Sequence, residues 1–546
     1  MKATFLGSDR RIESYHNIID LFIKLNQKEL EKKYISDAFR YLERAKARAF
    51  LDSIEISKIN LTEGINQKLL NQETELMNEI SKIHTKLLFP QITPEQRLEA
   101  NFQLGKYEEQ LESLKREIRA ASSAYANLRY PRTITLDEAQ QNILDTETAV
   151  FAYTIAKENS YAFVITQNDL KIFPLPRQKE IQKQVQMYLM DLTDVENQDF
   201  NLGYRLFNVL VQPGLEKIKV SKIVVVPDDI LYFLPFETLL TADKGREWLV
   251  KNYSIAYVPS LSVLRELIER KRMNGQKPAK DILALGDPSF GENEAEPGEV
   301  EANPGIPVFS PNSDYKFMRL RYSGLETEKI ASLFKPQKRN ILLRDQASEE
   351  NFKEQPLSDY RIIHLATHGL IDDKKPGRSA IIFSLDRDPK EDGFLQMREI
   401  FNLKLNADLV TLSACQTGLG QLIKGEGIEG LSRAFFYAGA SSVLLTLWAV
   451  NDQASYQLLE RFYFHLRSSE SIMSALRKAK LEMIHSGTLS HPYYWGGFVV
   501  SGKADRIIFH RTPYKWIVLT LSLCAGLAIL VLIINRERQN ILSFKD

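Results

Sequence analysis

Residues 408–420 read DLVTLSACQTGLG, and residues 359–369, further upstream, read DYRIIHLATHG. Each stretch begins with a short apolar run and stops at a reactive side chain, Cys415 in one and His368 in the other, with a glycine shortly after it. Such a run is typical of a strand that is buried on both faces of a parallel sheet. Open α/β sheets gather functional groups beyond the carboxyl ends of their strands, so both side chains are predicted to lie where such a sheet places its chemistry.

The sequence upstream of these strands predicts a layered α/β domain that starts near Pro131. Apolar runs at residues 149–156, 161–166 and 170–175 are separated by polar turns, as in a meander. Further strands are expected within 221–240 and at 255–259, 281–285 and 341–343, alternating with helices at 179–192, 200–217 and 325–334. Residues 287–314 are acidic and rich in Pro and Gly, and we expect a surface insertion there, with a lid or a processing site as the alternative.

The first 130 residues are predicted to be entirely helical. Two helices at residues 13–26 and 36–56 resemble the last unit of a tetratricopeptide array, and residues 1–60 are assigned to this pair. A single pair cannot bury its apolar face, so either upstream repeats are missing from this chain or the pair is an isolated hairpin. Residues 61–130 predict an antiparallel helical hairpin or coiled-coil arm, which serves as a spacer or binds a regulatory protein.

A single transmembrane helix is predicted near the C-terminus. Residues 516–534, WIVLTLSLCAGLAILVLII, contain no charge, and as a helix they would span about 28 Å, close to a bilayer core of about 30 Å. The alternative is a buried core helix. Basic residues flank both sides, so the positive-inside rule leaves the orientation open. Residues 535–546 form a short polar tail. Because the N-terminus has no signal-peptide pattern, we expect a C-terminal anchor and a cytoplasmic catalytic domain, unless an upstream signal is missing.

Composition excludes several classes of function. The 546 residues suggest two to four units. A formal net charge of +1 gives no indication of a nucleic-acid partner. The two cysteines, Cys415 and Cys524, form neither a disulfide framework nor a metal site, and Cys524 lies in the apolar C-terminal segment. No Walker A motif, dinucleotide fingerprint or G-x-S-x-G elbow is present, so no cofactor is predicted and a serine α/β hydrolase is disfavoured.

Several motifs, in order, resemble the CHAT domain, a caspase-like domain that is related to separases and often linked to tetratricopeptide repeats. They are HLATHG at 364–369, SACQTG at 413–418, the run GEGIEGLSRAFFYAGASSVLLTLWAVND at 425–452 and YYWGGFVVSG at 493–502. The stretch VVVPDDILYFLPFETLL at 224–240 is also similar to the usual run of this family. The resemblance covers residues 132–505, with a catalytic core at about 315–504. It implies a caspase-like α/β domain with a mostly parallel sheet.

The resemblance implies a catalytic dyad in which His368 is the histidine and Cys415 the nucleophile. The histidine lies 47 residues upstream of the cysteine, consistent with the caspase arrangement. A neighbouring imidazole increases the small thiolate fraction of a free thiol or acts as its base. The backbone N–H groups of Gly369 and Cys415 are then the candidates for an oxyanion hole. His364, four residues earlier, is read as structural, and no metal site is predicted because the two histidines lack a third ligand.

Asp452 is the candidate for substrate specificity. It follows a predicted strand, and in separases the aspartate at the similar strand end binds a basic P1 side chain. A carboxylate pairs well with the fork of an arginine, so cleavage after Arg, or alternatively Lys, is expected. The other interpretation is that Asp452 caps the helix predicted at residues 453–467. Glu426 and Glu429 are the other acids nearby.

The sequence therefore predicts a membrane-anchored CHAT-family cysteine endopeptidase that acts on protein substrates. Its N-terminal helices are expected to restrain its activity or to bind a partner. The competing interpretation is a catalytically silent or latent scaffold that gathers partners at the membrane through the helical region.

Overall fold

A computed structural model describes most of residues 2–46, 93–121, 133–291 and 319–509, together with parts of 72–86, Glu294, Phe317 and a few residues of 526–534. The longer gaps inside these ranges are 274–276, 371–378, 386–389, 414–420 and 424–426. The chain divides into two compact units, Met1–Arg506 and Ile507–Asp546. The first unit contains the sheet and the candidate site.

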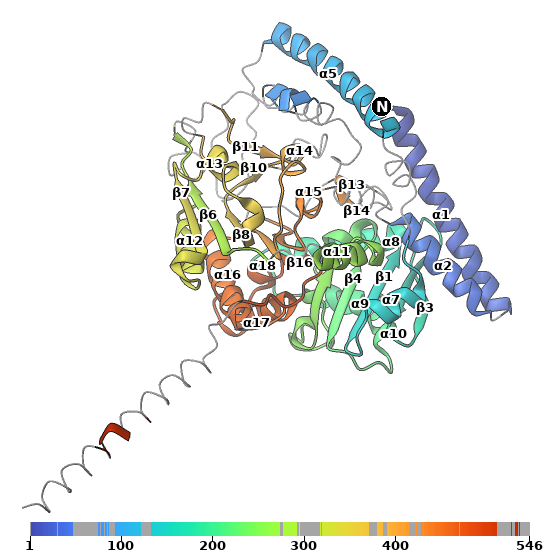
Figure 1. Cartoon of the computed structure of the whole chain (residues 1–546). Helices are drawn as coiled ribbons and strands as arrows, with labels where there is room; N and C mark the ends of the chain where they lie inside the picture. The colour runs from blue at the N-terminus through green and yellow to red at the C-terminus, as the bar shows by residue number, and fades with distance from the viewer. Residues whose placement is uncertain are drawn as a thin grey trace, which may run out of the picture. The chain divides into compact units, whose positions relative to one another are not determined.

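The first unit is built on an 11-stranded sheet with the order β3-β2-β1-β4-β5-β16-β15-β12-β8-β6-β7 (Figure 1). Seven of the neighbouring pairs are parallel, and the antiparallel ones are β2 with β3, β1 with β2 and β15 with β16. The strands are β1 (Thr148–Thr154), β2 (Ser160–Ile165), β3 (Leu170–Leu175), β4 (Lys222–Val226), β5 (Ser254–Tyr257), β6 (Lys280–Pro288), β7 (Arg339–Arg344), β8 (Tyr360–Ala366), β12 (Leu409–Ser413), β15 (Ser442–Thr446) and β16 (Phe498–Gly502). The predicted mostly parallel α/β sheet is therefore confirmed.

Two small sheets lie outside the main one. The first, in the order β11-β10-β9, consists of β9 (Gly369–Leu370), β10 (Ala380–Ile382) and β11 (Phe394–Gln396). The second pairs β13 (Gln421–Ile423) with β14 (Gly427–Glu429). The three-stranded sheet matters for the site because it begins one residue after His368.

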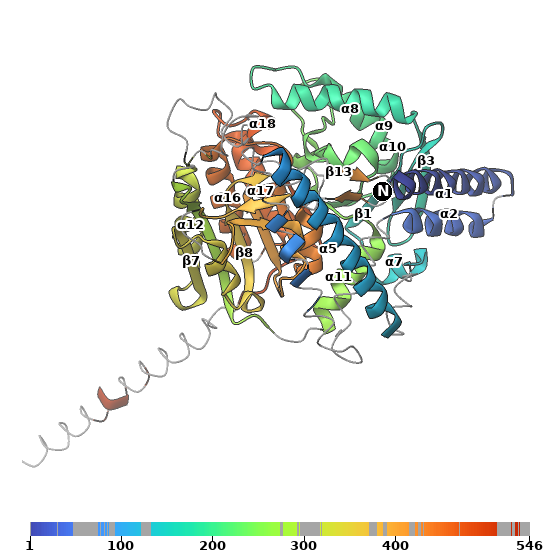
Figure 2. The ribbon, with the colours of Figure 1, turned by 90° about the horizontal axis from the view of Figure 1, so that it is seen from above.

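Helices lie on both faces of the main sheet. The α-helices described after residue 132 are α7 (Leu136–Asn142), α8 (Gln178–Thr193), α9 (Asn201–Leu210), α10 (Gln212–Leu215), α11 (Leu261–Met273), α12 (Arg321–Ser332), α13 (Glu349–Lys353), α14 (Met397–Ile400), α15 (Leu431–Ala438), α16 (Asp452–Arg467), α17 (Ile472–His485) and α18 (Pro492–Trp495). In Figure 2, α8 and α9 lie on one side of β1, and α7 and α11 lie on the other. Alternation along β1 explains this arrangement. Tyr153 donates to the carbonyl of Leu210 in α9, whereas Val150 and Ala152 belong to the core under α7 and α11.

The N-terminal helices α1 (Lys2–Glu29) and α2 (Lys32–Ala45) pack against this same core. Phe39 and Leu42 are buried in it beside Val150 and Phe163 of the sheet. Helix α5 (Pro94–Ala121) carries a separate apolar cluster in which Leu104 packs with Ile80. Most of residues 61–92 and all of 122–130 lie outside the described residues, so the helical hairpin expected at 61–130 stays a prediction. The division of the first 505 residues into three domains stays a prediction.

Two expectations for helices change. The helix predicted at 200–217 is broken into α9 and α10, because Pro213 has no N–H to donate within a continuous helix. The second N-terminal helix, expected at 36–56, starts four residues earlier and ends at Ala45, and residues 47–56 lie outside the described residues.

The last expectation for the fold is the transmembrane helix predicted at residues 516–534. Among the residues whose structure is described, no helix is long and apolar enough to cross a bilayer. Most of residues 516–534, and all of 535–546, lie outside those described residues.

Candidate active site

The parallel register of β8 and β12 aligns the two strands that carry the predicted dyad. Ala366, the last residue of β8, is paired with Ser413, the last residue of β12. His368 follows Ala366 by two residues, and Cys415 follows Ser413 by two residues. Neighbouring strands lie about 4.8 Å apart, so the last residues of these two strands, Ala366 and Ser413, are adjacent. Cys415 itself, like the rest of 414–420, lies outside the described residues.

His368 is held in a tight apolar setting at the end of β8. Only 3% of the His368 surface is exposed to solvent. Its carbonyl accepts a hydrogen bond of 2.9 Å from the N–H of Ile382, and Thr367 donates to the carbonyl of Ile382 at 2.5 Å. The rings of Phe290 and Phe317 lie 5.5 and 5.6 Å from the imidazole, centroid to centroid. Aromatic neighbours therefore shield this histidine from solvent.

The N–H of Gly369, the predicted oxyanion donor, can be located from the register of β9 and β10. Gly369 is opposite Ile381, and the neighbouring pair of His368 and Ile382 shares the 2.9 Å backbone hydrogen bond. Hydrogen-bonded and non-hydrogen-bonded pairs alternate in an antiparallel ladder. The pair of Gly369 and Ile381 is therefore of the second kind, and the N–H of Gly369 points away from β10.

His364 belongs to a buried polar chain inside the protein, as its structural interpretation requires. Its Nε2 lies 3.0 Å from a carboxylate oxygen of Glu326 on α12, and neither side chain is more than 1% exposed. Its Nδ1 lies 3.3 Å from the hydroxyl of Tyr463 on α16, which in turn lies 2.8 Å from the hydroxyl of Thr411 on β12. These contacts join β8 to α12, α16 and β12 inside the protein, which is what a structural role of His364 requires.

Asp452 is the first residue of α16 and follows β15, the strand next to β12. The alternative interpretation, that it caps this helix, is wrong, because the cap is Asn451, whose side chain accepts a hydrogen bond from the N–H of Ala454. The carboxylate of Asp452 instead accepts a 2.9 Å hydrogen bond from the N–H of Tyr322, in the first turn of α12. The carboxylate therefore caps a helix that lies 130 residues away in the sequence.

Burial raises the pKa of Asp452 to about 7. The hydrogen bond from Tyr322 lowers this pKa, whereas the nearby carboxylates of Glu326 and Asp287 raise it further. Asp452 is therefore poised to change charge near neutral pH, and its protonated form cannot pair with a cation.

Asp287 is a site residue that the sequence reasoning missed. It lies near the end of β6, the strand next to β8, so it shares the carboxyl edge of the sheet with His368. Arg319 binds its two carboxylate oxygens with hydrogen bonds of 2.9 and 2.8 Å, and Arg344 donates to one of them at 3.1 Å. The available signal was the sequence G-D-P after an apolar run, the pattern that drew attention to His368. Asp287 was instead assigned to the acidic insertion.

The close approach of α12 to β6 depends on Gly286. A Cβ at this position would lie 2.2 Å from the hydroxyl oxygen of Thr327 and 2.6 Å from the carbonyl oxygen of Ser323. The same contact lets the side chain of Ser323 accept a 2.9 Å hydrogen bond from the N–H of Asp287. Glycine therefore fixes the distance between the helix that Asp452 caps and the strand that carries Asp287.

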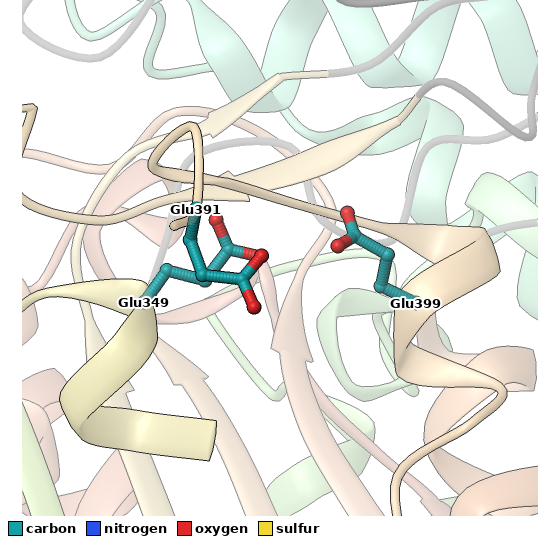
Figure 3. Close-up of side chains that lie close together, drawn as sticks. All are labelled: Glu349, Glu391 and Glu399. Carbon is teal, nitrogen blue, oxygen red and sulfur yellow. The ribbon is translucent and has the colours of Figure 1, made fainter. Parts of the chain in front are cut away.

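Three carboxylates form a second polar cluster, shown in Figure 3. Glu349 lies on α13, Glu399 on α14, and Glu391 on the segment before β11, and a ligand atom of each lies within 4.8 Å of the others. The ammonium of Lys353 contacts all three, at 2.8, 2.9 and 2.8 Å for Glu349, Glu391 and Glu399. Lys353 therefore joins the three carboxylates in one ion-pair network.

Glu426 and Glu429 are the other acids that the sequence offered for the role of Asp452. Glu426 lies outside the described residues, and for Glu429 only the backbone, in β14, is described. The roles of His368, Cys415, Gly369 and Asp452 in catalysis and binding stay predictions.

Comparison with known proteins gives the family. Residues 201–503 match the CHAT domain. Tetratricopeptide repeat protein 28 of Mus musculus is 33% identical over 122 residues, and that of Homo sapiens is 32% identical over the same length. These stretches cover 22% of this chain and 5% of the relatives, so the chain corresponds to a small part of either protein.

Two solved structures show a distant likeness. The separase–securin complex of Saccharomyces cerevisiae has a TM-score of 0.44 and 11% identity, covering 91% of this chain and 40% of that one. The Arg specific cysteine proteinase gingipain R has a TM-score of 0.38 and 9% identity, covering 67% of this chain and 79% of that one. The match to the CHAT domain spans more than half of the sequence, and the chain belongs to the CHAT domain family.

Proposed function

We propose that this chain is a cysteine endopeptidase that hydrolyses peptide bonds with Cys415 as nucleophile and His368 as base. The observation that supports the proposal is the aligned register of β8 and β12, in which Ala366 is paired with Ser413, each two residues before its proposed catalytic residue. Membership of the CHAT family supports it independently.

The proposed chemistry is acyl transfer. His368 takes the thiol proton of Cys415, and the thiolate attacks the carbonyl carbon of the scissile peptide bond. Backbone N–H groups of Gly369 and Cys415 donate to the oxygen that becomes negative in the tetrahedral intermediate. The imidazolium then returns the proton to the leaving amine, and an acyl-enzyme remains. Water, deprotonated by His368, hydrolyses this thioester and regenerates the thiol.

Specificity for a basic P1 residue is assigned to Asp452. A partly buried carboxylate pairs more strongly with a guanidinium than an exposed one does, since less solvent screens the pair. The substrates are proteins, and residues 516–534 would anchor the enzyme to a membrane, with the catalytic domain on the cytoplasmic side.

Regulation through the N-terminal helices is supported by buried polar contacts that bind them to the CHAT domain. Glu43 on α2 accepts hydrogen bonds from the N–H groups of Leu261 and Ser262, at 3.1 and 2.8 Å, and so caps α11. Lys46, at the end of α2, forms an ion pair of 3.1 Å with Asp228 in the turn after β4. A partner protein that moved α2 would break these hydrogen bonds and leave buried polar groups of the CHAT domain unpaired, at a cost in free energy. Binding of such a partner would therefore change the conformational stability of the CHAT domain.

Labelling with an arginyl chloromethylketone tests the proposal. We expect the full-length wild type to be labelled at one cysteine, and Cys415→Ala and His368→Ala to resist labelling. Cys524→Ala is the matched cysteine control and His465→Ala the matched histidine control, and both should label like the wild type. Labelling by probes with unrelated P1 residues would keep the dyad and remove Asp452 as the specificity residue. If no probe labels any variant, even with lysate added as a source of activating partners, the proposal fails and the scaffold interpretation stands.

A further inference from the structure

We propose that residues 317 and 319–322, here called the strap, hold the site closed, and that the ion pair between Arg319 and Asp287 keeps the strap in place. The inference rests on the proposed function, because it concerns the regulation of that same site. It starts from one observation: this short segment contacts His368, Asp287 and Asp452, which lie on three different elements of the site.

The first contact covers the predicted base. The Phe317 ring lies against the imidazole of His368 and, at 5.2 Å, against the ring of Phe290, which contacts the same imidazole from the end of β6. Phe317 is 1% exposed and shares an apolar cluster with Leu370 and Ile382 of the small sheet. An aromatic ring in this position keeps a substrate and bulk solvent away from His368. Moving it would expose a large apolar side chain to water, which carries a free-energy cost.

The second contact is the ion pair. Arg319 binds both oxygens of Asp287 in the bidentate geometry that makes arginine–carboxylate pairs strong and specific in orientation. The hydrogen bonds to Asp287 raise the pKa of Arg319, which stays charged throughout the working range of pH. The side chain of Arg319 is 40% exposed, whereas that of Asp287 is 10% exposed. A solvent-accessible arginine therefore reaches inward to an acid at the edge of the sheet.

The third contact occupies the specificity residue. The N–H of Tyr322 donates to Asp452, so the carboxylate assigned to the substrate already has a partner from the chain itself. Leu320, between Arg319 and the start of α12, is buried, and its carbonyl accepts from the N–H of Ser323. The last two residues of the strap, Arg321 and Tyr322, are also the first two residues of α12.

A substrate must displace the strap before it can reach His368. The closed state is stabilised by contacts of modest individual strength, so the equilibrium can be shifted by a single substitution or by a partner. Arg319 offers the sharpest test because its side chain is partly exposed, and its loss should not prevent folding. Phe317 is less suitable, because it belongs to an apolar cluster.

The experiment compares full-length wild type with Arg319→Gln, which keeps a long polar side chain but removes the charge. The first readout is the rate at which diethyl pyrocarbonate modifies His368, measured by mass spectrometry of the peptide that contains it. The second is the rate at which an arginyl chloromethylketone labels Cys415. We expect Arg319→Gln to increase both rates by about threefold to tenfold, the range that corresponds to losing a partly exposed but bidentate pair.

Arg344→Gln is the matched control. Arg344 also pairs with Asp287, but it lies on β7, outside the strap. Its removal should leave both rates at the wild-type value. An equal acceleration in Arg344→Gln would overturn the inference, because the effect would then come from the charge of Asp287 and not from the strap.

The two readouts separate this inference from the proposed function. Labelling of Cys415 with no change of either rate in Arg319→Gln refutes the strap and leaves the peptidase intact. Faster modification of His368 without labelling of any variant supports the strap and refutes the peptidase. Modification of His368 does not require a functional thiol, so the strap is tested in either case.

Discussion

Asp452 should make the preference for arginine depend on pH. Its pKa of about 7 lies more than three units above the ordinary value of 3.8, chiefly because of burial. With this pKa about 9% of the carboxylate is ionised at pH 6 and about 91% at pH 8. Only the ionised form pairs with a guanidinium. The advantage of arginine over an uncharged residue of the same shape should therefore increase about tenfold between these two pH values.

The assay measures kcat/KM for two peptides that differ only in arginine or citrulline at P1. Both peptides use the same His368 and Cys415, so the titration of the dyad cancels in the ratio of the two kcat/KM values. The pH dependence of this ratio then reports the ionisation of the group that binds the charge of the P1 side chain. Asp452→Asn is the matched variant, since its amide oxygen still accepts from the N–H of Tyr322. We expect the ratio to rise with pH in the wild type and to stay flat and low in this variant. A flat ratio in the wild type, or the same rise in Asp452→Asn, would refute the assignment.

The same raised pKa predicts a change in stability. Between about pH 4 and pH 7 the folded protein keeps a proton on Asp452 that the unfolded chain has released, so this group destabilises the fold progressively as the pH rises through that range. Asp452→Asn removes the effect. Relative to the wild type, the variant should be more stable at pH 7.5 than at pH 4.5, as measured by thermal unfolding at both pH values.

Three further predictions concern the framework around the site. Glu43→Ala should lower the free energy of unfolding by about 3 kcal/mol, because two backbone N–H groups of α11 lose a charged acceptor, whereas an exposed change such as Glu29→Ala should have little effect in the same urea titration. Lys353→Met should destabilise by about 3 kcal/mol at pH 7.5 and by less at pH 5.5, because burial raises the pKa of Glu349 and a protonated Glu349 does not need the ammonium as a partner; an equal loss at both pH values would contradict this. Gly439→Ala should cost at least about 2 kcal/mol, since its φ of +126° is strained for alanine and a Cβ would lie 2.1 Å from the carbonyl oxygen of Leu405, and Gly487→Ala, with φ +75° and open space, should cost about 1 kcal/mol in the same measurement.

Local sequence was sufficient to predict the strands. The runs VFAYT, YAFVI and LKIFPL became β1, β2 and β3 with boundaries shifted by no more than a residue or two, because apolar residues of high β-propensity end at polar turns there. The ends of β8 and β12 were also predicted from the sequence, because each apolar run stops close to a reactive side chain and a glycine. This information is local, and the backbone follows it closely.

The contacts that define the site are not local. The cap that Asp452 provides joins residues 130 positions apart, and the pairs of Arg319 and Arg344 with Asp287 join β6 to segments 32 and 57 residues away. Neither hydrophobic periodicity nor a sequence motif predicts which distant residues will form such pairs. The alternative interpretation of Asp452 as the cap of α16 was wrong because Asn451 and Asp452 are both good caps by composition, and the structure uses Asn451.

The position of β16 has a consequence for the synthesis of the protein. This strand, Phe498–Gly502, lies in the middle of the sheet, antiparallel to β15 on one side and parallel to β5 on the other. Until residues 498–502 have left the ribosome, the strands made before them form two separate sheets, each with an unpaired edge. The half that carries His368 can therefore join the half bound by the N-terminal helices through this sheet only after β16 has been made. The continuous sheet thus depends on a strand that is synthesised after all ten of its other strands.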